Sequence, residues 1–404
     1  MISTSTPPRA LLLTSLPPLS LYVHFPWCVR KCPYCDFNSH ALQGILPEQQ
    51  YVDALLADLE GQAASIAGRP LRSVFLGGGT PSLFSPAALG RLLEALSRQL
   101  PLAADLEVTL EANPGTMERG RFDAYRAAGI TRVSLGAQSF DPAQLQRLGR
   151  IHGAEDTQRA ALELHTTGLS NFNLDLMYGL PQQTTSEALR DLEQAIALQP
   201  AHLSHYQLTL EPGTVFAGRP PAGLPDGDAC ADMQLACQQL LHSAGYQQYE
   251  VSAYARPGAR FQHNLNYWGF GDYLGIGAGA HGKRSAFIGG ALRVERSVQK
   301  REPRRYLASC IPEWRVVARE DLCFEFMLNA LRLNEGFDCS DFEARTGLPI
   351  SAALPGLQSA QQRGLLECEQ SRWRPNAMGL NFLNDLLSPF LSQSRPRSSS
   401  AQPV

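Results

Sequence analysis

Three cysteines near the start of the chain, Cys28, Cys32 and Cys35, lie four and three residues apart. A short apolar run at residues 19–25 precedes them and predicts a β-strand, which Pro26 ends. Thiolates gathered on a loop after a strand can bind a metal centre. A structural zinc ion would need a fourth protein ligand, whereas three thiolates leave one position of an iron–sulfur cluster open. The spacing therefore favours a centre that binds a further molecule, with a zinc site or a redox pair of thiols as alternatives.

Polar residues mark the carboxyl ends of several predicted strands. From residue 19 to about residue 210, short apolar strands alternate with amphipathic helical stretches in six β–α units, which predicts a parallel sheet with helical crossovers. Rolled up, this α/β sheet is an incomplete (β/α)6 TIM-like barrel, and barrels build their sites at the carboxyl ends of strands. A glycine turn or a strand-end carboxylate can also be a plain connection or a helix cap, but their convergence on the cysteines favours one shared site. The residues are Gly78, Gly79, Thr80, Glu111, Gln138 and Asp175.

A Tyr-x-His-x-Pro strand that begins at Tyr22 leads directly into the Cys-x-x-x-Cys-x-x-Cys loop. This arrangement resembles the radical-SAM superfamily and, within it, the anaerobic coproporphyrinogen III oxidase family, most closely its haem-chaperone branch. The resemblance covers nearly the whole chain and implies a partial barrel of the radical-SAM type. It also implies a [4Fe–4S] cluster with Cys28, Cys32 and Cys35 as ligands, S-adenosylmethionine at the open iron, and bound haem. The residues that it carries over as cofactor contacts are Tyr22, Gly78, Gly79, Thr80, Glu111, Gln138, Arg150 and Asp175, although Arg150 would also suit a surface salt bridge.

One position departs from the decarboxylating oxidases of that family, which carry a fourth cysteine two residues after the third. This sequence has Phe37 there, a form that resembles the chaperone branch. We therefore expect a haem chaperone that binds the cluster, S-adenosylmethionine and haem, and that transfers haem to acceptor haem proteins, respiratory membrane proteins among them. A homodimer is one assembly to test. The alternatives are an oxygen-independent coproporphyrinogen III oxidase and a zinc-stabilised barrel with a binding role only.

A His-Asn-x-x-Tyr-Trp segment at residues 263–268 matches a motif of the haem-chaperone branch that is linked to haem binding. In this interpretation His263 supplies an axial imidazole, and Tyr267 and Trp268 form an aromatic wall for the porphyrin. The alternative is that the same aromatic residues pack between two domains. The residues alone leave both interpretations open.

Further along the chain, other side chains could bind haem iron. Residues 275–282 are rich in glycine, and we expect a loop there that approaches the cofactor mouth. His281 lies in this segment and is a second candidate for the axial imidazole. Cys310 and Cys323 are candidates for a thiolate ligand.

The composition narrows the class of protein. Hydrophobic residues make up 44% of the 404 residues, as in ordinary globular proteins, and charged residues, at 18%, are on the low side. A net charge of −3 gives no overall basic field for nucleic acid. We expect no membrane span, because no apolar run is long enough. Nine cysteines, an odd and mostly scattered set, do not suggest a disulfide framework and suit a cytoplasmic protein.

The length and the change of pattern along the chain predict one large and one smaller domain. After residue 319 the pattern becomes helical with one hairpin, which favours a mainly helical, winged-helix-like domain with a docking role. We expect a flexible leader at residues 1–18, the radical-SAM partial barrel at 19–215, a barrel extension with the His-Asn-x-x-Tyr-Trp segment at 216–318, the C-terminal helical domain at 319–391 and a disordered tail at 392–404.

Overall fold

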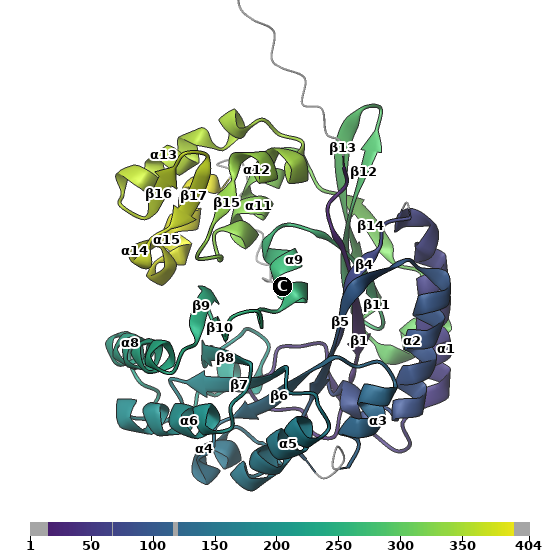
Figure 1. Cartoon of the computed structure of the whole chain (residues 1–404), viewed down its shortest axis with the longest axis vertical. Coiled ribbons are helices and arrows are strands. Elements are labelled where there is room, and N and C mark those ends of the chain that lie inside the picture. The colour runs from purple at the N-terminus through teal and green to yellow at the C-terminus, as the bar shows by residue number, and fades with distance from the viewer. Residues whose placement is uncertain (1–14, 67, 116–119, 392–404) are drawn as a thin grey trace, which may run out of the picture.

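The computed structural model describes residues 15–66, 68–115 and 120–391. One large sheet organises this part of the chain, with its strands in the order β14-β13-β12-β11-β1-β4-β5-β6-β7-β8-β10-β9. The sheet curls around an interior (Figure 1), and within the described residues its end strands do not pair with each other. The architecture is the incomplete α/β barrel that the sequence predicts. Its six consecutive parallel strands are β1 (Leu19–Phe25), β4 (Leu71–Gly78), β5 (Leu102–Ala112), β6 (Arg132–Gln138), β7 (Phe172–Tyr178) and β8 (His202–Gln207).

Helices cover the outer face of these six strands, as Figure 1 shows. Leu55 and Leu59 of α1 are fully buried in the same core as Leu21 and Val23 of β1, so apolar faces of helix and strand hold the two layers together. Side-chain caps fix where helices begin; at the start of α2 the Ser85 hydroxyl accepts a hydrogen bond from the backbone N–H three residues later. The helices are α1 (Glu48–Ala63), α2 (Pro86–Gln99), α3 (Phe122–Ala127), α4 (Pro142–Arg147), α5 (Ala154–Thr166) and α6 (Thr185–Ala197).

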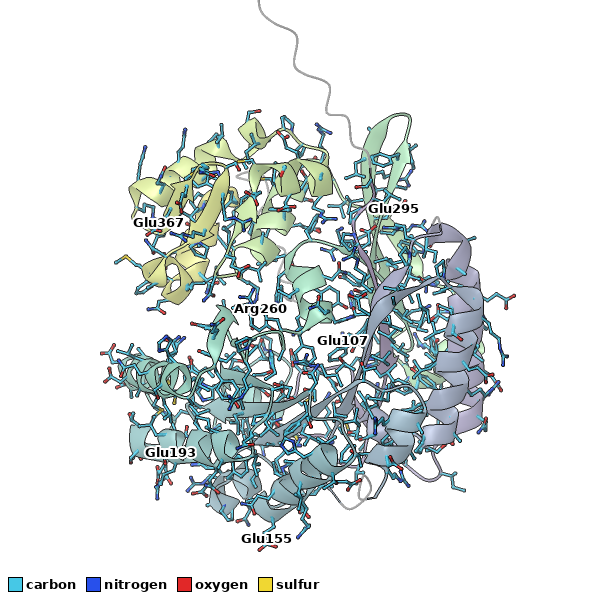
Figure 2. The ribbon with its side chains drawn as sticks, viewed as in Figure 1. Glu107, Glu155, Glu193, Arg260, Glu295 and Glu367 are labelled. Atoms are coloured by element: carbon cyan, nitrogen blue, oxygen red, sulfur yellow. The ribbon has the colours of Figure 1, made fainter. Side chains whose placement is uncertain are left out.

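The inner face of the parallel sheet is polar. Ser73 on β4 donates a hydrogen bond to Ser20 on β1 at 2.7 Å, and Arg132 on β6 forms a buried ion pair with Glu107 on β5 at 3.2 Å. Figure 2 shows Glu107 inside the curve of the sheet, whereas Glu155 extends outward from a covering helix. A barrel interior filled with branched apolar side chains would be a packed core. A polar interior suits a bound ligand instead.

The chain then returns to the first strand and extends the sheet. β11 pairs in parallel with β1, on the side away from β4, and adds a parallel strand that the sequence analysis did not predict. The expectation of one loop over residues 275–282 is wrong in part, because Gly275 and Ile276 belong to β11 and β12 begins at His281. A Cβ on Gly275 would overlap the His281 carbonyl oxygen, so the glycine allows close strand packing rather than flexibility. The elements here are α7 (Val215–Gly218), α8 (Gly227–Ser243), β9 (Gln247–Glu250), β10 (Ala253–Ala255), α9 (Gln262–Trp268), β11 (Asp272–Ile276), β12 (His281–Ile288), β13 (Ala291–Val298), α10 (Pro303–Ala308) and β14 (Glu313–Val316).

The last third of the described chain has a hydrophobic core of its own. Phe326, Phe342, Leu357 and Trp373 meet there, and Phe270, which precedes β11, inserts into the same core and ties it to the barrel. The helices followed by a β-hairpin agree with the winged-helix-like shape that the sequence predicts (Figure 1). The elements are α11 (Leu322–Ala330), β15 (Phe337–Asp338), α12 (Cys339–Thr346), α13 (Leu354–Gln362), β16 (Leu366–Glu369), β17 (Arg372–Pro375), α14 (Ala377–Asn381) and α15 (Leu383–Leu387).

The predicted disordered tail at residues 392–404 and most of the predicted flexible leader, residues 1–14, lie outside the described residues. Among the helices that the structure does describe, none has the length and apolar character needed to cross a membrane.

Candidate functional site

The three cysteines share one short loop at the carboxyl end of β1. The strands β2 (Trp27–Cys28) and β3 (His40–Ala41) pair in parallel and close this loop at its base. Within it, the backbone N–H of Cys35 donates to the carbonyl of Cys32 at 3.2 Å, which forms a tight turn around Pro33. All three thiols are free and half-buried. The loop therefore presents three potential metal ligands from one rigid base.

Burial and neighbouring groups shift the pKa of the thiols in the cysteine loop. Burial raises the pKa of Cys28, and the nearby Cys35 and Cys32 raise it further, whereas a hydrogen bond with Thr80 lowers it. Within the described residues, no three His, Cys, Asp or Glu side chains are gathered closely enough to hold one metal ion.

The predicted glycine turn lies directly against the cysteine loop. Gly79 donates its backbone N–H to the carbonyl of Phe25 at 2.7 Å, and Thr80 donates to the carbonyl of Trp27 at the same distance. A Cβ on Gly79 would lie 2.6 Å from the Trp27 carbonyl oxygen, so this contact requires glycine. Gly78 has a φ of 111°, which only glycine adopts without strain. The glycines therefore place β4 and the cysteine loop side by side.

Glu111 and Asp175 lie near each other under this mouth. Burial, and then the neighbouring Asp175 carboxylate, raise the pKa of Glu111 to about 8. Its Oε2 accepts a hydrogen bond from the backbone N–H of Gly78 at 2.9 Å. Burial also raises the pKa of Asp175, although Asn173 and Ser134 donate hydrogen bonds to it at 2.8 and 3.2 Å. Two buried carboxyl groups side by side favour a cationic ligand between them.

Arg150 connects the neighbouring strand ends with the cysteine loop. Its guanidinium donates to the carbonyl of Gly136 at 2.6 Å, to Asn113 Oδ1, and to Cys32 Sγ at 3.6 Å. Its Nε is buried without a partner among the described residues. The alternative of a surface salt bridge is therefore wrong for Arg150. A cation in this position can bind the carboxylate of a ligand.

Tyr22 and Gln138 complete the set of predicted contacts. The Tyr22 hydroxyl shares a hydrogen bond with His24 Nδ1 at 3.0 Å, and burial followed by the charge of Glu111 raises the pKa of Tyr22. Gln138 ends β6 with a φ of 67° and accepts a hydrogen bond from the Tyr206 hydroxyl at 2.8 Å. The predicted contact residues come from strands that are far apart in the sequence. The contacts and charges described here connect them around one mouth.

Two polar residues of this mouth were missed in the sequence. Asn113 bonds both Arg150 and the Thr80 hydroxyl, and Tyr206 bonds Gln138. The signal was present in each case: Asn113 follows Glu111 by two residues, and Tyr206 follows Ser204 by two. Side chains two residues apart on a strand project from the same face. Checking every second residue at the ends of these two strands would therefore have identified Asn113 and Tyr206.

His263 lies inside the barrel, below the mouth, with its ring centroid 6.4 Å from that of Tyr22. Its Nδ1 shares a hydrogen bond with Ser73 at 2.9 Å, its ring stacks on Phe75 at 5.0 Å, and the residue is 1% exposed. Ser73 precedes Gly78 by five residues, which is about 16 Å along a strand. The structure therefore places His263 beside Tyr22, a predicted cofactor contact, and not at the cysteine loop itself. Its Nε2 is buried with no partner among the described residues.

The aromatic residues of the same motif lie where the barrel meets the C-terminal helices. The ring of Tyr267 packs edge-on against Tyr273 at 4.3 Å. The guanidinium of Arg332 lies 4.4 Å from the ring centre of Trp268. This is the packing between two parts of the chain that was the alternative for this motif. Of the other candidate haem ligands, His281 is exposed at the start of β12, while Cys310 and Cys323 are half-buried beside apolar cores.

Comparison with known proteins agrees with this geometry. The family model for the radical SAM superfamily matches residues 22–195, and that for the HemN C-terminal domain matches residues 317–382. A heme chaperone HemW of Escherichia coli is 52% identical over 94% of this chain and its own full length, and that of Haemophilus influenzae is 49% identical over 94% and its full length. A bovine mitochondrial radical S-adenosyl methionine domain-containing protein is 36% identical over 93% of this chain and 87% of its own.

Among solved structures, the coproporphyrinogen III oxidase HemN of Escherichia coli superposes with a TM-score of 0.77 over 94% of this chain and 92% of its own, at 24% identity. At that identity the likeness concerns the fold, including the partial barrel and the helical C-terminal part. The two HemW proteins are much more similar in sequence, at 52% and 49% identity over their full lengths, and this similarity decides the assignment. The chain belongs to the heme chaperone HemW family of radical SAM proteins.

Proposed function

We propose that this protein is a haem chaperone that binds a [4Fe–4S] cluster, S-adenosylmethionine and haem, and that passes haem to acceptor haem proteins. The observation that carries this proposal is the 52% identity, over the full length of the relative, to a protein named heme chaperone. The polar mouth described above supports the two cofactors. Respiratory haem proteins at the membrane are the acceptors that we would test first. A homodimer is the assembly that we would test first.

The residues of the mouth would divide the cofactors between them. Cys28, Cys32 and Cys35 would hold the cluster, whose remaining iron supplies an open site for the amino and carboxylate groups of S-adenosylmethionine. Glu111 would bind the positive charge of that cofactor, and Asp175 its hydroxyl groups. The buried and partly unpaired guanidinium of Arg150 supports binding of a carboxylate. The remaining contacts in this proposal are Tyr22, Gly78, Gly79, Thr80 and Gln138.

We further propose that the protein has no coproporphyrinogen III oxidase activity. Phe37 stands where the sequence pattern of the oxidases has a fourth cysteine, and it is an exposed side chain on the cysteine loop. The oxidase remains the second candidate because the fold of HemN covers 94% of this chain. Nine free cysteines suit a reducing compartment, and we therefore propose a cytoplasmic location.

The test begins with protein purified without oxygen. We expect about four irons and four acid-labile sulfides per chain, lost in a Cys28→Ser, Cys32→Ser, Cys35→Ser variant, whereas a zinc-stabilised barrel would contain zinc and no sulfide. Haem should bind at a ratio of about one per chain and move to an apo-acceptor that is followed by its absorbance. Turnover of coproporphyrinogen III to product under the same conditions would replace the chaperone with the oxidase.

A further inference from the structure

The antiparallel end of the sheet carries basic side chains on one face, beside the cysteine loop. In the strand register, Lys283 of β12 lies opposite Arg296 of β13, and Arg296 lies opposite Arg315 of β14. Opposite residues of an antiparallel pair project from the same face, as do residues two apart on one strand. His281 therefore shares this face with Arg296 and Arg315. Because Lys283 also lies opposite Tyr273 of β11, the face continues the sheet next to β1.

Asn38 attaches this part of the sheet to the cysteine loop. Its side-chain amide donates hydrogen bonds to the carbonyls of Ala278 and Arg301, at 2.9 and 2.8 Å. Its own carbonyl is bonded to His24 Nε2 at 2.9 Å. A Cβ on Gly279 would overlap the Asn38 amide, so the turn before His281 fits closely against the residue that follows Phe37. The cysteine loop and the start of β12 are therefore held in a fixed relationship.

Some of the basic side chains here are paired with carboxylates and others are not. Lys283 forms a buried ion pair with Asp272 at 2.9 Å. Arg296 is held by Glu325 at 2.7 Å and by the Tyr273 hydroxyl at 2.6 Å. Arg301 and Arg315 are exposed, and neither guanidinium has an ion pair or a side-chain hydrogen bond among the described residues. Their charges reach His281: burial first, and then Arg296, Arg301 and Arg315, lower the pKa of its imidazole. Two free guanidinium groups next to a neutral imidazole favour an anionic ligand.

The neighbouring cysteine loop adds exposed apolar side chains. Phe37 is 57% exposed and Val29 49% exposed. The backbone carbonyl of Phe37 accepts a hydrogen bond from Lys31 at 3.0 Å, which holds the loop on its outer side. An exposed phenyl ring offers a flat apolar contact. A ligand that covers this place would therefore combine a flat apolar body with negative groups.

We propose that haem docks on the rim formed by Phe37, His281, Arg301 and Arg315, which we call the haem rim. This inference rests on the proposed function, since it assumes that the protein binds haem. The neutral imidazole of His281 donates its lone pair to the haem iron, the two arginines bind the propionate carboxylates, and Phe37 packs against the macrocycle. The ligand thus comes from the exposed edge of the mouth and not from His263, which is buried in the barrel interior.

This arrangement gives Phe37 a use that a fourth cysteine could not have. A thiol at that position would place another iron ligand beside the cluster, whereas the phenyl ring contacts the porphyrin and leaves the cluster with three ligands. The haem rim also lies on the surface, where an acceptor protein can reach its ligand. The buried side chain of His263 has no such access.

The test is a haem titration of the full-length protein, followed by absorbance. We expect His281→Ala to weaken haem binding by roughly tenfold or more and to change the absorption bands that report the axial ligand, with recovery of those bands on addition of imidazole. Arg301→Gln with Arg315→Gln should weaken iron-free protoporphyrin as strongly as haem, but should not alter binding of the porphyrin dimethyl ester. His242→Ala and Arg219→Gln, on exposed residues elsewhere, are the matched controls and should bind haem as the wild type does.

The possible results separate the two proposals. If the wild-type protein bound no haem, the proposed function and the haem rim would both be overturned. If the wild type bound haem and His281→Ala kept the same affinity and spectrum, only the haem rim would be wrong. If a folded His263→Ala variant lost the axial-ligand bands while His281→Ala kept them, the iron ligand would be His263 on α9 instead.

Discussion

The guanidinium of Arg150 donates a hydrogen bond to the sulfur of Cys32 at 3.6 Å, across 118 residues of sequence. The same side chain bonds the carbonyl of Gly136 at the end of β6. One cation therefore connects the cysteine loop with the strand ends on the other side of the mouth.

From this contact we predict the effect of Arg150→Ala. The change removes a charged donor and should weaken S-adenosylmethionine binding by roughly 1.5–3 kcal/mol, the range for hydrogen bonds to charged groups. Isothermal titration of the anaerobically reconstituted protein would measure it. Arg147→Ala is the matched control, because Arg147 is exposed on α4 and bonds the Pro181 carbonyl away from the cysteines. Equal affinities in the two variants would contradict the role given to Arg150.

Gly79→Ala should disrupt the cysteine loop. The new Cβ would lie 2.6 Å from the Trp27 carbonyl oxygen, closer than atoms can approach, so the loop must move. We expect a loss of about 2 kcal/mol or more in the free energy of unfolding, measured in urea, and a lower iron content. Gly61→Ala on α1 is the control: it has no neighbour within 4 Å and should stabilise the helix by roughly 0.5–1 kcal/mol. Full iron content in Gly79→Ala would show that the close contact is not needed.

The affinity for a cationic cofactor should depend on the protonation of Glu111. Its pKa of about 8 lies above the usual 4.5, because the carboxylate is buried next to Asp175. Near pH 7 the group is mostly protonated in the unliganded protein, so binding of a cation must first remove that proton. We expect binding of S-adenosylmethionine to tighten as the pH rises toward 8 and then to level off. Glu111→Gln should bind S-adenosylmethionine more weakly, and its affinity should not rise with pH. A wild-type affinity that is constant between pH 6.5 and 8.5 would refute this role of Glu111.

The same pKa has the opposite effect on folding. A carboxyl whose pKa is raised in the folded protein binds more protons there than in the unfolded chain, so Glu111 should lower the stability of the unliganded protein as the pH rises from about 4.5 to about 8. Glu111→Gln removes this contribution. Urea denaturation of both proteins at several pH values would show the difference as a smaller loss of stability in the variant.

Asp58→Ala should loosen the turn behind the cysteine loop. The carboxylate of Asp58 on α1 accepts hydrogen bonds from the backbone N–H of Gly277 at 3.1 Å, from the Tyr306 hydroxyl at 2.9 Å and from the Gln299 amide at 2.9 Å. Removal leaves these buried donors unpaired, at a cost of about 3 kcal/mol or more in the free energy of unfolding. Asp58→Asn keeps an acceptor oxygen and should cost less. Equal urea midpoints for the two variants would contradict this account.

Much of the mouth was predictable because its chemistry is written in local patterns. The cysteine spacing, the glycines after residue 76 and the strand-end positions of Glu111, Gln138 and Asp175 all follow from short motifs on alternating strands and helices. Parallel strands joined by crossovers bring their carboxyl ends together whatever the loops between them do. That rule alone places these side chains at one mouth.

Other features depend on contacts between segments that no local pattern connects. Arg150 could be a surface residue by its sequence, and only the packing of its loop against Pro33 and Cys32 turns it inward. Gly275 looks like part of a flexible loop, yet it makes room for a strand because the His281 carbonyl lies against it. For Arg150 the deciding contact comes from a residue 118 positions away in the sequence, and for Gly275 it comes from the way β12 folds back against β11.

The sequence by itself therefore determined the barrel, the cysteine loop and the family, since periodicity and motif spacing are local properties of the chain. The tertiary structure decided which candidate histidine is accessible: His263 is buried inside the barrel and His281 is exposed at the mouth. Burial is set by the sum of all neighbouring elements, and for His263 these include Ser73 and Tyr22, on strands far from it in the sequence. No window along the chain contains that information.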